Sequence, residues 1–214
     1  MSRASLTTTS YAVLGLLSVR SWSSYELTQQ MDRSLGRIWP RAVSKLYEEP
    51  KKLVSHGLAR SSTEQNGRRS RTVYAITARG RRALAAWLRE PAEGPVLEFE
   101  QLLKVFFAEN GTKADVLATL AASESWARAR CQESLAVGGP YAEGSGPFPE
   151  RLAELQLTSR FITDFYLLVG EWARWASHVV ETWPEDPRQA RPDQEVIAET
   201  LARAAYGTEP AGQP

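Results

Sequence analysis

The sequence predicts a mainly α-helical protein, in which an N-terminal domain of short helices and one β-hairpin precedes an all-α C-terminal domain. Three observations lead to this fold class. Apolar residues recur at helical spacing through most of the 214 residues. Residues 71–76 instead alternate and are rich in β-branched and aromatic side chains, and Asn66-Gly67 before them is a hairpin signal. Pro91 and Pro95 interrupt the helical pattern and mark a domain boundary.

The near-neutral net charge of +1 conceals two regions of opposite charge. Residues 1–90 hold 16 lysines and arginines against 6 aspartates and glutamates, whereas residues 91–214 hold 10 against 19. The N-terminal region therefore carries +10 and the C-terminal region −9. This asymmetry favours a polyanion-binding domain joined to one that does not bind polyanions, although surface charge can also drift without function.

Composition restricts the class of protein. Apolar residues make up 43% of the chain, which is enough for two modest domains. Cys131 is the single cysteine, which excludes an internal disulfide and fits a reducing compartment. The sequence has no N-terminal apolar run typical of a signal peptide and no uncharged run of roughly 20 residues for a membrane span. We therefore expect a soluble, cytoplasmic protein that has no membrane partner.

Two helices are predicted to open the chain. Residues 6–19 form the first helix, which Thr7–Ser10 can cap, and Gly15 within it predicts close approach by another helix. Ser23 begins the second helix, with Glu26 as the partner residue of a capping box. Tight turns then lead to a third, basic element at residues 39–58.

The third element has an apolar side (Leu46, Leu53, Leu58) and a cationic side, which is typical of a DNA recognition helix. Cations meet phosphates, while short side chains reach base edges in the major groove. Pro50 requires the helix either to begin near it or to kink, and Gly57 ends the helix. The predicted DNA contacts here are Arg41, Ser44, Lys45, Tyr47, Lys51 and Lys52, with core packing as the alternative for Tyr47.

A β-hairpin and a fourth helix complete the N-terminal domain. The predicted strands are residues 58–63 and 71–76, and a hairpin that follows a recognition helix is a wing. Thr77 caps the fourth helix, whose inward side chains are expected to be Leu84, Trp87 and Leu88. The wing adds three predicted contacts to phosphates or a minor groove, Arg68, Arg69 and Arg71. Some of the selected cations can alternatively be ordinary solvated surface charges.

The C-terminal domain is predicted to be entirely helical. A strongly apolar helix covers residues 96–109, and Thr112 with Asp115 caps a second over residues 112–135. Residues 138–149 are rich in glycine and proline and are predicted to form a loop. A long helix over residues 150–183 and a last helix over residues 193–206 follow. The expected buried face of the second helix is Leu117, Leu120, Ala121, Cys131 and Leu135.

The long helix carries two apolar stripes, which predict two different packing partners. One stripe includes Ile162 and Val169, and the other consists of Phe161, Leu168 and Trp175. We expect one side to pack within its own domain and the other against a second copy of the chain. The residues selected for this dimer interface are Phe161, Phe165, Leu168, Trp172 and Trp175, with burial inside one subunit as the alternative.

Ordered motifs run through about 80 residues of the N-terminal domain. They are Thr8-Thr-Ser-Tyr-Ala-Val-Leu-Gly-Leu-Leu, Tyr25-Glu-Leu, Leu46-Tyr47, Leu53, Gly57-Leu58, Arg68-Arg-Ser-Arg-Thr-Val-Tyr74 and Thr77-Ala-Arg-Gly80. In this order they resemble the PadR family of bacterial transcriptional regulators. The C-terminal domain is similar to that family only in architecture, and Pro50 stands where the family more often has an apolar helix former.

The resemblance implies a homodimer with a winged helix-turn-helix domain, usually a repressor, that binds double-stranded DNA and dimerises through a helical extension. Some members of the family respond to phenolic or other flat hydrophobic compounds. A small hydrophobic or phenolic effector is therefore a further expected partner. Trp126 and Trp172 are the residues selected for it, although an aromatic residue on a helix is more often plain core.

Together these features predict a sequence-specific transcriptional regulator that binds a pseudo-palindromic operator. The expected domains are residues 1–90 (DNA binding), 91–95 (linker), 96–207 (dimerisation) and 208–214 (disordered tail). His56, His178 and Cys131 lack metal-ligand spacing, and no phosphate-binding glycine loop or nucleophile motif is present, so we expect neither enzyme activity nor a cofactor. The competing interpretation is a protein-interaction module whose winged helix contacts a protein partner.

Overall fold

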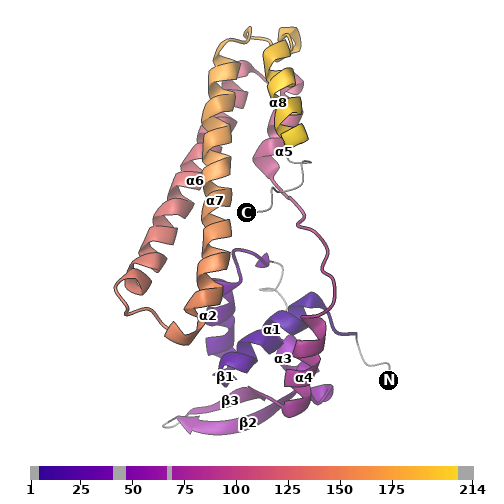
Figure 1. The fold of residues 1–214 in the computed structure, drawn as a ribbon, viewed down its shortest axis with the longest axis vertical. Coiled ribbons are helices and arrows are strands. Elements are labelled where there is room, and N and C mark those ends of the chain that lie inside the picture. Colours follow the sequence, from indigo (N-terminus) through magenta and orange to yellow (C-terminus); the bar gives the residue numbers. More distant parts are fainter. Residues whose placement is uncertain (1–4, 41–46, 67–68, 207–214) are drawn as a thin grey trace. The chain divides into compact units, whose positions relative to one another are not determined.

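The computed structural model describes residues 5–40, 47–66 and 69–206, and the chain divides into two compact units, residues 1–95 and 96–214. Both units are mainly helical, and the first also contains a three-stranded antiparallel sheet (Figure 1). The predicted fold class, mainly helical with a wing in the N-terminal part, is confirmed. The predicted tail, residues 208–214, lies outside the described residues.

The first two helices begin at the predicted capping residues. α1 (Thr8–Val19) starts after Thr7, whose side chain accepts a hydrogen bond from the backbone N–H of Ser10. α2 (Ser24–Ser34) starts after Ser23, which forms the predicted capping box with Glu26. Both helices contribute to the interior of the first unit, whose most deeply buried large side chains include Leu14, Leu17, Leu27, Met31 and Leu53.

α3 (Glu49–Ser55) is the described helix of the recognition element. Pro50 lies within its first two positions, where a missing N–H costs no helical hydrogen bond, so the helix begins beside the proline and is not kinked by it. Gly57 follows with a φ of +70°, the left-handed conformation predicted for the residue that ends this helix. The close approach predicted at Gly15 is not seen among the described residues, where a Cβ atom added to it meets nothing within 4 Å.

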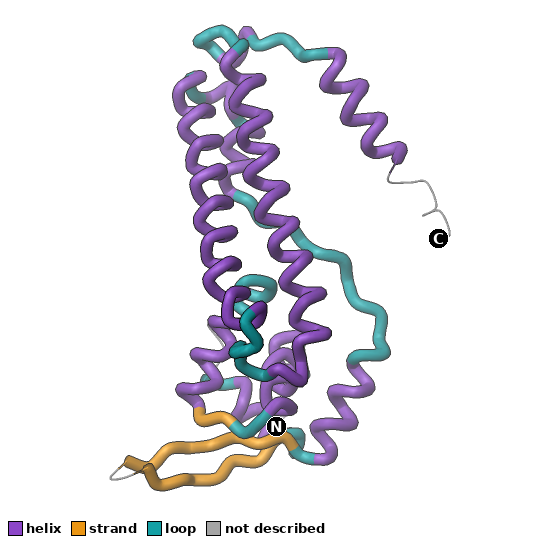
Figure 2. Tube along the Cα trace, turned by 60° about the vertical axis from the view of Figure 1, so that its left-hand side comes forward, coloured by secondary structure: helices purple, strands orange, loops and turns teal. Residues whose placement is uncertain are grey.

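The sheet of the first unit has the order β1-β3-β2, with all pairs antiparallel. β2 (Ala59–Asn66) and β3 (Arg69–Ile76) form the wing, in register from the Ala59–Ile76 pair to the Asn66–Arg69 pair. Both strands extend further toward the turn than predicted. β1 (Trp22–Ser23) was not predicted, because two residues are too short for an alternating pattern. The wing projects from the helices of its unit in both views (Figure 2).

α4 (Ala78–Trp87) packs closely on the end of the wing. Thr77 caps it as predicted, and the Thr77 hydroxyl also donates to the backbone carbonyl of Gly57. Gly80 is required here, since a Cβ atom would lie 2.1 Å from the carbonyl oxygen of Leu58. Trp87 stacks on Tyr11 of α1 with ring centroids 5.0 Å apart, whereas Leu88 is exposed and its predicted inward position is wrong.

The second unit begins with less helix than predicted. Residues 96–99 are not helical, α5 (Glu100–Phe106) has seven residues, and a 3₁₀ turn, η2 (Ala108–Asn110), follows. The expectation of one helix over residues 96–109 is therefore wrong. Val96 and Leu97 are exposed and α5 buries no residue within the unit. Val105 of α5 packs against the core of the unit, whereas the exposed Val96 and Leu97 gain no such packing to stabilise a longer helix.

Two 30-residue helices, α6 (Lys113–Ala142) and α7 (Leu152–Glu181), lie side by side and form most of the second unit (Figures 1 and 2). The Thr112–Asp115 capping box of α6 is confirmed. α6 continues through Gly138 to Ala142, so the predicted loop from residue 138 starts too early. A short 3₁₀ turn, η3 (Pro149–Arg151), precedes α7.

The face of α6 that packs against α7 differs from the predicted one. Leu120 is buried as expected, but Ala121 and Leu135 are exposed, and Ser123 and Ala127 are buried instead. A Cβ atom added to Gly170 of α7 would lie 3.3 Å from the Ala127 methyl group, so small residues bring the helices together. Large apolar residues alone therefore did not identify the interface. One core cluster of the unit contains Ala108, Val116, Leu120, Ala176 and Val180.

The chain ends with a separate helix, α8 (Gln194–Tyr206), after a 3₁₀ turn, η4 (Pro187–Gln189). The side chain of Asp193 accepts hydrogen bonds from the backbone N–H groups of Glu195 and Val196, as predicted for a helix cap. α8 buries no residue, and Ile197, Leu201 and Tyr206 are exposed.

Candidate nucleic-acid interface

The described part of the recognition element is anchored by a buried carboxylate. Glu49, the first residue of α3, is 5% exposed. Its Oε2 atom accepts a hydrogen bond of 2.6 Å from the hydroxyl of Ser10 on α1. Lys52 Nζ lies 3.5 Å from Glu49 Oε1 and 3.3 Å from Ser10 Oγ. A buried carboxylate needs this pairing, and the cluster fixes α3 against α1.

The residues predicted to contact DNA from this element fall into three groups. Arg41, Ser44 and Lys45 lie outside the described residues. Lys52 is only 18% exposed and is held inside the unit by Glu49 and Ser10. Tyr47 is 64% exposed and Lys51 is also exposed, so within the described unit Tyr47 does not pack into the core. Tyr47 and Lys51 are therefore the described residues of this set that face solvent.

The wing places its cations in different environments. Arg68 lies outside the described residues, and Arg69 begins β3 opposite Asn66. Arg71 is directly opposite Glu64 in the strand ladder, and its NH2 atom lies 3.1 Å from Glu64 Oε2. Its NH1 atom lies 3.9 Å from Oε1 of Glu26 on α2. Arg71 is thus half-exposed and already paired with two carboxylates.

Glu26 connects the wing to the start of α2. Its Oε2 atom accepts a 2.8 Å hydrogen bond from the backbone N–H of Ser23, while its Oε1 atom faces both Arg71 and Arg20. Hydrogen bonds from the side chain and backbone of Ser23 lower the pKa of Glu26, and the nearby charges of Arg71 and Arg20 lower it further. The carboxylate is therefore charged at neutral pH and fixed in position.

Additional cations at the surface of the first unit were not selected from the sequence. Arg20 lies over the ring of Trp22, 3.8 Å from its centroid, and 4.0 Å from Glu26. Arg60 on β2 is exposed, and Arg81 on α4 donates to the carbonyl of Ser18 over 3.3 Å. Arg20 and Trp22 are two residues apart, which is a pattern visible in the sequence. The contact between the two side chains depends on the short strand β1, which the sequence does not predict.

The residues selected for dimerisation divide between two sides of α7. Phe161, Leu168 and Trp175 are 66%, 61% and 46% exposed. Phe165 instead faces the ring of Trp126 on α6 with centroids 6.5 Å apart, and Trp172 faces the ring of Phe99 at 5.8 Å. The first three therefore form an uncovered apolar stripe, spaced seven residues apart. Phe165 and Trp172 are partly covered by their own chain.

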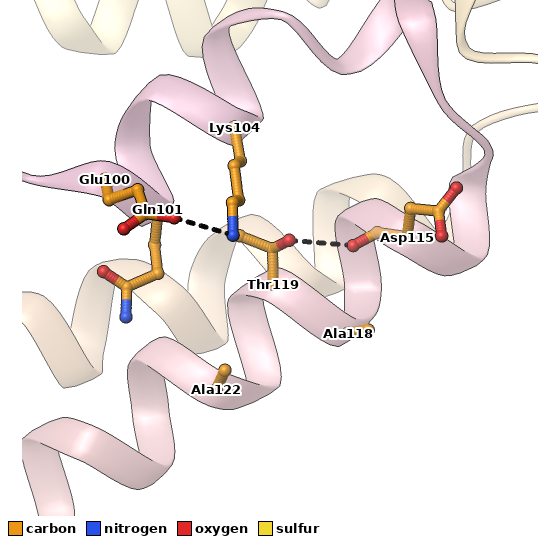
Figure 3. Close-up of a pocket in the computed structure, with 7 residues that line it drawn as sticks. All are labelled: Glu100, Gln101, Lys104, Asp115, Ala118, Thr119 and Ala122. Carbon is orange, nitrogen blue, oxygen red and sulfur yellow. Dashed lines mark hydrogen bonds and ion pairs between the residues drawn. The ribbon is translucent and has the colours of Figure 1, made fainter.

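The two residues selected for an effector do not share ring partners. Trp126 contacts Phe165 and Tyr166, with centroids 6.5 and 5.4 Å away, whereas Trp172 contacts Phe99. A separate recess of about 420 Å³ lies between α5 and α6 (Figure 3). Its lining includes Lys104, which points to Glu100 and lies 2.9 Å from its carboxylate. Neither tryptophan lines the recess.

The described ranges contain neither a metal-binding cluster nor a membrane-spanning helix. Within residues 5–40, 47–66 and 69–206, no three His, Cys, Asp or Glu side chains are grouped so as to hold a metal ion. Among the same residues, no helix combines the length and apolar character needed to span a bilayer.

The chain is similar to known transcriptional regulators in sequence. A family model described as the transcriptional regulator PadR-like family matches residues 13–86. A probable transcriptional regulator of Mycobacterium tuberculosis is 35% identical over 82 residues, which are 38% of this chain and 43% of the relative. The negative transcriptional regulator PadR of Bacillus subtilis is 32% identical over 99 residues, 45% of this chain and 54% of the relative. The aligned part thus spans about half of each relative or less.

The fold is similar to solved PadR structures over a larger part of the chain. B. subtilis PadR in complex with operator DNA matches with a TM-score of 0.70 and 21% identity, covering 81% of this chain and 99% of that one. The same protein in complex with p-coumaric acid matches with a TM-score of 0.65 and 19% identity, covering 82% and 99%. The family and these relatives are regulators rather than enzymes.

Glu26→Gln tests whether the charge of the Glu26 carboxylate holds the start of α2. Because the folded pKa lies below the ordinary value, the charge stabilises the fold above that value, and the contribution is lost as the pH falls through the folded pKa. At pH 7 the substitution should lower the free energy of unfolding by about 1 kcal/mol. At pH 3 the loss should be smaller, because this pH lies below the ordinary pKa of glutamate and the unfolded chain then binds a proton at Glu26. Denaturant titration followed by circular dichroism measures both values.

Glu90→Gln is the matched control for this experiment. Glu90 is exposed in the same unit and loses the same charge, so its unfolding free energy should change by less than about 0.5 kcal/mol at either pH. An equal loss at pH 7 and pH 3 for Glu26→Gln would show that the charge of Glu26 is not what stabilises α2.

Proposed function

We propose that the chain is a PadR-like transcriptional regulator, since its residues 13–86 match the model of that family, and that it is a repressor that binds double-stranded DNA as a homodimer. The observation that carries the proposal is the charge distribution on a winged helix-turn-helix unit. The unit places a basic recognition element and an arginine-bearing wing in a region of net charge +10. The relative described as a negative regulator supports repression. We infer a cytoplasmic location, because a repressor acts on chromosomal DNA.

The proposed contacts divide into base-reading and phosphate-binding residues. Arg41, Ser44, Lys45 and Tyr47 precede α3 and are assigned to the major groove, while Lys51 flanks them on the exposed side of α3. Arg68 and Arg69 at the wing are assigned to the DNA backbone or minor groove. A dimer then reads a pseudo-palindromic operator with half-sites about one DNA turn apart.

Arg68→Ala combined with Arg69→Ala tests the phosphate contacts of the wing. Each lost phosphate contact should flatten the slope of log affinity against log salt by about 0.9, so the double variant should lose roughly 1.8. Affinity should fall for every duplex sequence. Titration of a fluorescent duplex at salt concentrations from about 50 to 200 mM measures the slope.

Arg188→Ala combined with Arg191→Ala is the control, because it removes the same charge from the second unit. Its slope should equal that of the wild type. If the wild type binds duplexes without salt dependence, or not at all, the DNA-binding function is wrong and the protein-interaction alternative gains support.

The dimer is inferred from the uncovered stripe of Phe161, Leu168 and Trp175. Three large apolar side chains at seven-residue spacing on a 30-residue helix suit a partner helix. Leu168→Glu places a charge in that interface and should weaken dimerisation roughly 100-fold or more. Sedimentation velocity at micromolar concentration should therefore show a dimer for the wild type and a monomer for the variant.

Ser159→Glu is the matched control for the dimer. Ser159 is exposed on the same helix, nine positions from Leu168, and therefore on its opposite side. This variant should remain dimeric. A monomeric wild type, or dissociation of both variants alike, would contradict the assignment of the stripe.

A phenolic effector is inferred to bind beside Trp126. The half-exposed ring of Trp126 stands edge-on to Phe165 and Tyr166, which provides apolar surface suited to a flat aromatic ring, and B. subtilis PadR binds p-coumaric acid. The proposed site combines Trp126 with these two residues rather than with Trp172, which contacts Phe99.

Adding p-coumaric acid to the protein–DNA complex should release the duplex. Trp126→Leu should raise the concentration needed by roughly 10-fold, which corresponds to the loss of one aromatic contact of about 1.4 kcal/mol. Tyr206→Ala, which removes an exposed aromatic ring of α8, should leave it unchanged. Fluorescence anisotropy of the duplex measures release, and equal effects of the two substitutions would contradict the site.

A further inference from the structure

Arg71 of the wing is held between two carboxylates, those of Glu64 and Glu26. Its NH2 atom lies 3.1 Å from Oε2 of Glu64, and its NH1 atom lies 3.9 Å from Oε1 of Glu26. A guanidinium group binds carboxylate and phosphate with the same fork of N–H donors. A DNA phosphate can therefore bind the guanidinium of Arg71 only if it competes with the carboxylates of Glu64 and Glu26.

The two carboxylates differ in their freedom to move. Glu26 is fixed by the 2.8 Å hydrogen bond from the Ser23 backbone and faces Arg20 as well as Arg71. Glu64 lies on β2 directly opposite Arg71, and about half of its side chain is exposed. Within the described part of the chain, its ion pair is with Arg71. Glu64 can therefore turn into solvent when an anion approaches, whereas Glu26 stays with the helix start.

The surroundings of Arg71 leave room for such an exchange. Arg71 and Thr72 of β3 line an open recess of about 350 Å³ together with Ser23, Ser24, Tyr25 and Glu26 of β1 and α2. The charges of Arg20 and Arg71 are balanced here by those of Glu26 and Glu64. This side of the wing therefore offers no surplus positive charge until Glu64 moves away.

We propose that Glu64 limits sequence-independent DNA binding by occupying the guanidinium of Arg71 in place of a backbone phosphate. Glu64 moves aside only where the rest of the unit is correctly seated on DNA, so a random duplex gains less from the wing than an operator does. The inference rests on the DNA-binding function proposed above and assigns Glu64 as a residue that determines specificity.

The test compares Glu64→Gln with Glu90→Gln on a random fluorescent duplex. Both variants remove one negative charge from the first unit, but Glu90 is exposed and has no ion pair among the described residues. An exposed ion pair is weak, so freeing Arg71 should tighten binding by about 2- to 5-fold relative to Glu90→Gln. The slope of log affinity against log salt should steepen by about 0.9, which is one added phosphate contact.

Repeating Glu64→Gln in an Arg71→Gln background shows whether Glu64 acts through Arg71. The gain in affinity and the steeper slope should both disappear there. A gain that persists without Arg71, or equal affinities for Glu64→Gln and Glu90→Gln, overturns the inference while leaving DNA binding intact. A wild-type protein without salt-dependent binding instead overturns the proposed function, and the inference with it.

Discussion

The buried carboxylate of Glu49 is the interaction on which the first unit depends. It joins α1 to α3 through Ser10 and Lys52, and it is also the residue at which α3 begins. Replacing Lys52 would leave the buried carboxylate of Glu49 without its cation, and breaking a buried ion pair costs about 3–5 kcal/mol. This contact between two helices thus fixes the start of α3 against α1.

Because of ion pairs within the first unit, fewer of its cations can bind DNA phosphates than its net charge suggests. Lys52 is engaged by Glu49 and Ser10 in the interior, and Arg71 is engaged by Glu26 and Glu64 at the wing. These cations count toward the net charge of +10, yet each has a carboxylate partner before any DNA arrives. Long-range attraction still depends on the total charge, whereas the number of displaced counterions depends on the cations that are free to meet phosphates. All charged residues of the unit therefore contribute to long-range steering toward DNA, whereas only the cations without a carboxylate partner contribute to counterion release.

Features fixed by local chemistry could be predicted from the sequence, and features fixed by distant contacts could not. The capping boxes at Ser23 and Thr112 and the left-handed Gly57 involve neighbours in the chain, and all three are present. The inward position of Lys52 depends on Ser10, 42 residues away, which no spacing pattern reveals. The pairing of Arg71 with Glu64 requires the strand register, and the predicted turn was too long to give it. The predicted helix is shortened at its start, where Val96 and Leu97 are exposed and have no packed face, although these residues are strongly apolar.

A weakened wing is consistent with a protein that binds DNA through two copies. If Glu64 reduces the affinity of each unit for any duplex, a single copy holds even its operator weakly. Joining two units through α7 makes the second contact intramolecular, so the affinities of two half-sites combine at an operator. A random duplex has no second matching half-site at the required spacing, so dimerisation raises the affinity for it less than the affinity for an operator. In the proposed regulator, two features therefore favour the operator over other DNA. The dimer formed through the uncovered stripe of Phe161, Leu168 and Trp175 raises affinity for two half-sites, and the carboxylate of Glu64 lowers affinity for a random duplex.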